Sequence, residues 1–188
     1  MRPSKIVCLL VPVLCFGVAG VVTADDAKEK PEQISVFKSG TLVVPATFKR
    51  VPVKSRIIEH EFQAQAGKGD DAKTARVTMM AAGGDVAANI ARWKSQFTGG
   101  DQEAQKTEDM KLGDWKVYIV DVAGSFQERM GGGPFAGGKV VERADHAMTG
   151  AILVHPEGRK YFVKMIGPAA VVKANREAFV KMIKSIEK

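Results

Sequence analysis

Short runs of β-branched and aromatic residues recur from residue 41 onward, and such runs predict strands. The runs 41–44 (TLVV) and 47–51 (TFKRV) each end at a proline, which favours an edge strand or a bend. Residues 75–82 (ARVTMMAA) form another run of the same kind. We therefore expect the folded part of the chain to begin near Thr41 with a broken strand.

The stretch 56–64 (RIIEHEFQA) alternates between two sets of side chains, as a strand with one buried face does. The set expected to face a core comprises Ile58, His60, Phe62 and Ala64. The opposite set comprises Ile57, Glu59, Glu61 and Gln63. Because Glu59 and Glu61 lack the glycine and the spaced acids of a calcium loop, we expect both to be solvated charges.

The stretch 115–123 (WKVYIVDVA) is apolar on both of its alternating faces. Trp115, Val117 and Ile119 share one face, and Tyr118, Val120 and Val122 share the other. A strand that is apolar on both sides is typical of the centre of a sheet that is covered above and below. We expect this strand to be central.

Two amphipathic helices are predicted. Asp85 offers an N-cap for the first, which we expect to end at Gly99 and Gly100. Its apolar stripe follows the helical period and consists of Val86, Ile90, Trp93 and Phe97. We interpret this stripe as core packing rather than a cofactor-binding box, because the period alone explains it.

The second helix ends the chain. The turn HPEGR between the strands 149–154 and 160–166 predicts a hairpin. Pro168 is then expected at the first helical position. The apolar stripe of the helix comprises Val171, Val172, Ala178, Phe179, Met182, Ile183 and Ile186.

The order of these elements is strands, a helix, strands joined by hairpins, and a final helix. It predicts an α+β domain with a mainly antiparallel sheet and a C-terminal amphipathic helix. A regular βαβ alternation is missing, which excludes a doubly wound parallel fold. The assignment of 140–145 (VVERAD) stays open.

The N-terminus has the pattern of a secretory signal peptide. Arg2 and Lys5 precede the apolar run 6–22, and Ala24 offers a cleavage point. The alternatives are a retained membrane anchor and lipidation at Cys15, where Leu14 stands in place of the small residue required. We predict a signal peptide over 1–24, a flexible polar leader over 25–40 and one domain over 41–188, exported to the periplasm or outside the cell.

Cleavage would change the chemistry available to the chain. Cys8 and Cys15 are its two cysteines, so the mature protein would have no disulfide and no thiolate nucleophile. The net charge of +7 would fall by two to +5. The charges are interspersed and the protein is exported, so nucleic acid is not an expected partner. Contact with a membrane is expected only through an uncleaved signal segment.

The glycine-rich stretch 133–139 (GPFAGGK) matches the first seven positions of a phosphate-binding loop. The eighth position is Val140 rather than Ser or Thr, and no helix is predicted after it. We therefore interpret the stretch as a mobile connection or a partner-binding flap. The candidate partner-binding residues are Met130, Gly133, Pro134, Phe135 and Lys139.

The sequence contains no complete catalytic or metal-binding motif. His60, His146 and His155 lack the short spacing of a metal site, and His155 is expected to be exposed in a turn. His60 and Asp121 share inward parity and could meet, but we favour pairing with each other or with an arginine over catalysis. No serine lies in GxSxG. We expect no cofactor and no metal, and we favour a binding protein over an enzyme.

Two stretches, LVVPATFKR and YFVKMIGPAAVVKANREAFVKMIKSI, resemble the PsbP-like fold family. The span from Thr41 to Ile186, with AANIARW, GGPFAGGK and VERADHAM, resembles a set of exported bacterial proteins of unassigned function. The resemblance implies an α/β/α sandwich around an antiparallel sheet. Its motifs are packing and turn motifs, so the accessory role of the photosynthetic members is not carried over.

These observations predict an exported, non-enzymatic binding or accessory domain for a protein or a cell-envelope component. One alternative is an enzyme whose site is assembled from scattered residues. Another is a binder of an anionic polymer or lipid surface through Lys173, Lys181 and Lys184. A pocket with converging ionisable groups would favour the enzyme, and a shallow apolar patch beside the glycine-rich stretch would favour the binder.

Overall fold

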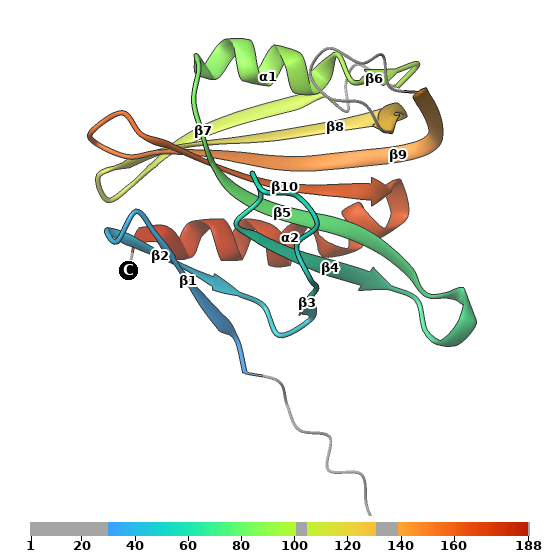
Figure 1. The fold of residues 1–188 in the computed structure, drawn as a ribbon, viewed down its shortest axis with the longest axis horizontal. Helices are drawn as coiled ribbons and strands as arrows, with labels where there is room; N and C mark the ends of the chain where they lie inside the picture. The colour runs from blue at the N-terminus through green and yellow to red at the C-terminus, as the bar shows by residue number, and fades with distance from the viewer. Residues whose placement is uncertain (1–29, 101–104, 131–138, 188) are drawn as a thin grey trace, which may run out of the picture.

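The computed structural model describes residues 30–100, 105–130 and 139–187. Within them, eight strands form one sheet in which every pairing is antiparallel (Figure 1). The strand order is β3 (Phe48–Arg50), β4 (His60–Ala66), β5 (Lys73–Ala82), β10 (Lys160–Pro168), β9 (Lys139–Val154), β8 (Trp115–Met130) and β6 (Phe97–Thr98). The remaining strand, β7 (Lys106–Leu112), pairs with the first part of β8. The predicted signal peptide lies outside these residues.

Helices cover both faces of the sheet. The helix α1 (Val86–Lys94) lies over one face, and α2 (Ala169–Lys184) lies over the other (Figure 1). In β8, Val117 and Ile119 face α2, whereas Val120 and Val122 face α1, and all four are at most 2% exposed. The predictions of an α+β fold and a mainly antiparallel sheet are confirmed, and this part of β8 is covered on both sides as predicted. The prediction that the strand is central is wrong, because β8 lies next to the edge strands β6 and β7 and the middle of the strand order is β10.

On the α1 face, Asp85 is the predicted N-cap, and its carboxylate accepts a hydrogen bond from the Ala88 amide at 2.9 Å. The helix ends at Lys94, earlier than predicted, and Phe97 reaches the same apolar cluster from β6. The indole of Trp93 lies directly over Gly150 of β9, where an added Cβ would be 2.7 Å from the ring. The predicted apolar stripe is therefore core packing, although only part of it is helical.

On the α2 face, the predicted apolar stripe is buried, with Phe179 and Ile183 fully inside. Pro168 is the N-cap rather than the first helical residue, because its ψ of 134° is extended and it still pairs with His146 of β9. A short 3₁₀ turn, η3 (Ser185–Glu187), follows the helix. The amphipathic C-terminal helix is confirmed with a start one residue later than predicted.

The prediction of a flexible leader over 25–40 is wrong for its second half. Residues 32–44 form a hairpin of β1 (Glu32–Val36) and β2 (Gly40–Val44) beside α2. Ile34 and Val36 are 3% and 0% exposed, so this segment belongs to the core. The polar residues before Ile34 conceal the strand, because only two inward positions identify it.

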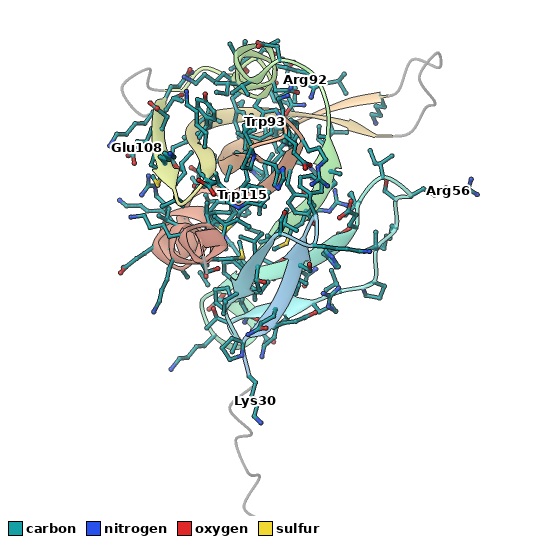
Figure 2. The ribbon with its side chains drawn as sticks, turned by 90° about the vertical axis from the view of Figure 1, so that its left-hand side faces the viewer. Lys30, Arg56, Arg92, Trp93, Glu108 and Trp115 are labelled. Atoms are coloured by element: carbon teal, nitrogen blue, oxygen red, sulfur yellow. The ribbon has the colours of Figure 1, made fainter. Side chains whose placement is uncertain are left out.

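The strand predicted over 56–64 is also shorter than expected. It begins at His60, and residues 51–59 form a loop in which the Ile58 amide donates to the Ser55 carbonyl at 3.2 Å. Ile57 is 72% exposed, and Arg56 projects from this loop away from the sheet (Figure 2). The alternation in the sequence extends beyond the strand, because the turn at Ser55 ends the regular backbone.

The strands β8 and β9 form a long ribbon that includes the stretch 140–145 left open above. The pairing register shifts between Gly124 and Phe126, and Gly124 has a φ of 149°. An irregularity of this kind bends a ribbon. The outer half of the ribbon, residues 126–130 of β8 and 139–143 of β9, lies beyond this shift. It lies beside the end of α1, where the Gln127 amide donates to the Gln96 carbonyl at 2.8 Å.

Candidate functional site

A cleft of about 880 Å³ opens on the α1 face of the sheet. Its floor comes from β4, β5 and β10, and its walls come from the end of α1 and the outer half of the β8–β9 ribbon. Ionisable side chains from all of these elements line it, namely Glu61, Arg76, Arg92, Glu128, Arg143 and Lys164. Its volume falls in the range of pockets that hold small organic molecules.

Strand alternation places the floor residues. Phe62, Val77 and Met165 point into the core under α2, so their neighbours Glu61, Thr78 and Lys164 point to the opposite face. The nine-residue helix α1 is too short to cover this whole face. The cleft is the part of the sheet that α1 leaves uncovered.

Glu61 and Arg76 form an ion pair across β4 and β5. The Arg76 Nε and Nη2 atoms donate to the two carboxylate oxygens at 2.7 and 2.8 Å. The hydrogen bonds from Arg76 lower the pKa of Glu61, against the opposing effect of burial. Glu61 is 7% exposed, so the prediction of a solvated charge is wrong at this position. The reason is that the neighbouring strands β4 and β5 direct polar side chains to the same face of the sheet, where Arg76 covers the Glu61 carboxylate inside the cleft.

Lys164 lies at the floor of the cleft, in the middle of β10. Its ammonium is 5.3 Å from the centroid of the Trp93 ring, a cation–π arrangement. Burial, followed by the charges of Arg92 and Arg76, lowers the pKa of Lys164 to about 8. Among the described residues, no carboxylate forms an ion pair with this ammonium.

The other cationic groups lie nearer to the mouth of the cleft. Arg92 donates to the Asn89 side-chain oxygen, and Arg143 donates to Glu128 at 3.0 Å. Four cationic and two carboxylate side chains line the described cleft, an excess of two positive charges when His146, which also lines it, is not counted. Two of the cations are paired with these carboxylates, so the excess belongs to Arg92 and Lys164.

A smaller cleft of about 420 Å³ lies on the α2 face. Here Asp121 accepts hydrogen bonds from Thr149 Oγ1 at 2.7 Å and from Arg176 Nη2 at 2.7 Å, and Glu108 is 3.7 Å from Arg176. The contact considered between His60 and Asp121 is not formed. His60 lies on β4, separated from β8 by the strands β5, β10 and β9, and its Nδ1 is 3.4 Å from Arg50 Nη2. Asp121 is paired with an arginine, as the structural interpretation expected.

Of the five candidate partner-binding residues, the structure describes only the first and the last. Met130 is the last residue of β8 and pairs with Lys139, the first residue of β9. Gly133, Pro134 and Phe135 lie outside the described residues. The loop therefore joins the two strands of the ribbon, whose outer half forms one wall of the cleft.

The prediction that His155 is exposed is wrong, because it is 9% exposed. Its ring packs edge-on against Trp115 at 5.0 Å, and its Nδ1 accepts from the Glu157 amide at 3.2 Å. The β9–β10 turn folds back on itself, with the His155 amide donating to the Arg159 carbonyl at 2.8 Å. This closure draws the imidazole into the core at the end of the strand.

Sequence reasoning missed Lys164, Arg76 and Arg92 as site residues. A signal was present for two of them, since Lys164 interrupts the apolar run KYFVKMI and Arg76 lies inside ARVTMMAA. A charged residue within a β-rich run must reach solvent or a polar cavity. The sequence alone could not show that residues 90 positions apart lie side by side on paired strands, as Arg76 and Ile166 do.

Within 30–100, 105–130 and 139–187, no group of three or more His, Cys, Asp or Glu side chains could hold a metal ion. In the same residues, neither helix has the length and hydropathy needed to cross a membrane. No protein-family model and no curated protein matches the chain. The cleft and its charges are therefore the basis for inferring a function.

Proposed function

We propose that this chain is an exported, non-enzymatic binding domain, and that its cleft over β4, β5 and β10 takes up a ligand bearing an anionic group. One observation carries the proposal: Lys164 and Arg92 converge on a cleft in which the described carboxylates are already paired with other arginines. The partner would be a cell-envelope component or a protein segment with an accessible carboxylate or phosphate.

Electrostatics supports an anion as the ligand. Each cation in the cleft disfavours the charge of the others, which is why Arg92 and Arg76 contribute to the lowered pKa of Lys164. An anion would relieve this repulsion and accept hydrogen bonds from both Lys164 and the guanidinium of Arg92. Because Lys164 is partly buried beneath α1, its charge is screened by salt less than a surface charge is.

The fold and the location belong to the same proposal. An α/β/α sandwich of the PsbP-like kind is supported by the antiparallel sheet with a helix on each face. The two stretches that carry the resemblance correspond to β2–β3 and β10–α2. Export is supported by the basic residues and the apolar run of 1–24.

The rival surface is the exposed side of α2, where Lys173, Lys181 and Lys184 are solvent-accessible. These lysines could attract an anionic polymer or lipid by charge alone. The cleft is favoured over them because its lysine is desolvated and lies opposite a second unpaired cation, whereas the α2 lysines lie on an open surface.

Calorimetric titration of the purified exported protein with citrate tests the proposal. We expect Lys164→Met and Arg92→Met each to weaken citrate binding at least tenfold, since each removes one of the two unpaired cations. The matched control Lys181→Met removes the same charge from α2 and is expected to leave the affinity within about twofold. Equal weakening by all three variants would contradict the cleft and favour a diffuse surface effect.

A further inference from the structure

We propose that Lys164 captures a carbonyl compound as a reversible imine, the compound being an aldehyde or ketone whose anionic group is held by Arg92 at the mouth of the cleft. This inference rests on the proposed anion site and adds a covalent step to it. It assigns to the cleft a chemical class of ligand, a small carbonyl compound bearing a carboxylate or a phosphate.

The geometry holds the amine inside the cleft. Lys164 lies on the central strand β10, flanked by Thr78 of β5 and Gly150 of β9. Since Gly150 has no Cβ, the Trp93 ring lies close over β9, and the ammonium of Lys164 is 5.3 Å from the centroid of that ring. The ammonium of Lys164 therefore lies against the face of the Trp93 ring at the floor of the cleft, and the cleft is large enough to admit a small ligand beside it.

The surroundings also favour the reactive form of the amine. With its pKa at about 8, about a tenth of the Lys164 side chains are neutral at pH 7, against about one in 2,500 for an ordinary lysine. A desolvated lysine beside another cation is an established way to obtain a nucleophilic amine in proteins. Here the nearby cations are Arg92 and Arg76, and burial makes the largest contribution.

The step is balanced without any oxidant or reductant. The lone pair of the neutral Nζ attacks the carbonyl carbon and forms a C–N bond, and the carbonyl oxygen takes a proton to give a carbinolamine. Loss of the hydroxyl then forms the C=N bond, so that the carbonyl oxygen and both amine hydrogens leave as one water. Hydrolysis reverses the step and releases the ligand.

Pyridoxal 5′-phosphate is a suitable probe, because it carries an aldehyde and a phosphate, and pyridoxal is its matched control without the phosphate. The protein is treated with each probe at pH 7.5, reduced with borohydride, and digested for mass spectrometry. We expect the phosphate-bearing probe to label Lys164 at least tenfold faster than the exposed Lys181, and at least tenfold faster than pyridoxal labels Lys164. Inorganic phosphate should slow the labelling of Lys164 by competition.

The variant Lys164→Arg keeps the positive charge and removes the nucleophile. We expect it to lose the rapidly formed adduct, whereas Lys181→Arg makes the same change on the exposed side of α2 and keeps the adduct at Lys164. Citrate binding together with labelling of Lys164 no faster than Lys181 would overturn the imine and leave the anion site standing. Rapid labelling by both probes alike, without citrate binding, would overturn the anion site and hence the assigned class of ligand.

Discussion

At the scale of single residues, the α1 face depends on a close approach between helix and sheet. Trp93 packs edge-on against Phe162 with ring centroids 5.2 Å apart, and it lies over Gly150. The same ring contacts the ammonium of Lys164. One glycine therefore affects both the packing of α1 and the position of the lysine in the cleft.

Gly150→Ala should destabilise the protein by about 1–3 kcal/mol, because the new methyl group would overpack a buried contact. The added Cβ would be 2.7 Å from the Trp93 ring, so the ring must move. Urea unfolding measures the change. The control Gly83→Ala adds a methyl group where no atom lies within 4 Å and should change stability little. Equal effects of the two substitutions would show that α1 does not press on β9 as described.

At the scale of elements, charged pairs join one strand to the next and the sheet to α2. Glu61 of β4 and Arg76 of β5 form such a pair in the cleft, and Asp121 of β8 and Arg176 form another between the sheet and α2. In the first pair the carboxylate is nearly buried and the arginine is half exposed, which limits the net stabilisation.

Glu61→Gln should cost about 1 kcal/mol at neutral pH, after allowance for the exposure of Arg76. Because the pKa of Glu61 is lowered in the folded state from 4.5, its carboxylate stabilises the fold above that value, and this contribution is lost as the pH falls below it. Urea unfolding at pH 7 and pH 3 should therefore show a gap between wild type and variant that closes in acid.

The exposed Glu142 of β9 provides the control for this prediction. Glu142→Gln removes a carboxylate of the same type from the solvent-facing side of the ribbon and should produce a smaller gap at pH 7. A gap for Glu61→Gln that stays constant between pH 7 and pH 3 would mean that the ion pair does not stabilise β4 against β5.

Elements with strong local patterns could be predicted from the sequence, and elements defined by their neighbours could not. The 115–123 strand and the final helix carry long apolar patterns, so their type and buried faces are correct. In contrast, β7 (KTEDMKL) lies at an edge and has charges at most positions, and β1 has only two buried residues. Their strand character comes from pairing with β8 and β2.

At the scale of the whole molecule, the sheet has unequal cover on its two faces. The α2 face is covered by a sixteen-residue helix and the β1–β2 hairpin, whereas the α1 face has a nine-residue helix (Figure 1). The larger cleft lies on the α1 face. The two tryptophans lie on opposite faces of the sheet, Trp93 in the apolar cluster under α1 and Trp115 in the α2 core (Figure 2).

The candidate site is a product of this long-range arrangement. Its cations come from β5, α1, β9 and β10, and the sheet order rather than any local motif brings them together. The motif GPFAGGK, predicted to be a partner-binding flap, lies between β8 and β9 in the chain, and all of it except Lys139 is outside the described residues. Local periodicity predicts faces of elements, and only the pairing of strands shows which charged faces share a cleft.

The most direct test of the anion site uses the two tryptophans of the chain as reporters on opposite faces. In nuclear magnetic resonance spectra of the ¹⁵N-labelled protein, the two indole N–H signals are assigned with Trp93→Phe and followed during titration with citrate. We expect the Trp93 signal to shift in a saturable way and the Trp115 signal to stay in place. A Trp93 signal that does not move, or equal shifts of both signals, would contradict an anion site in the cleft.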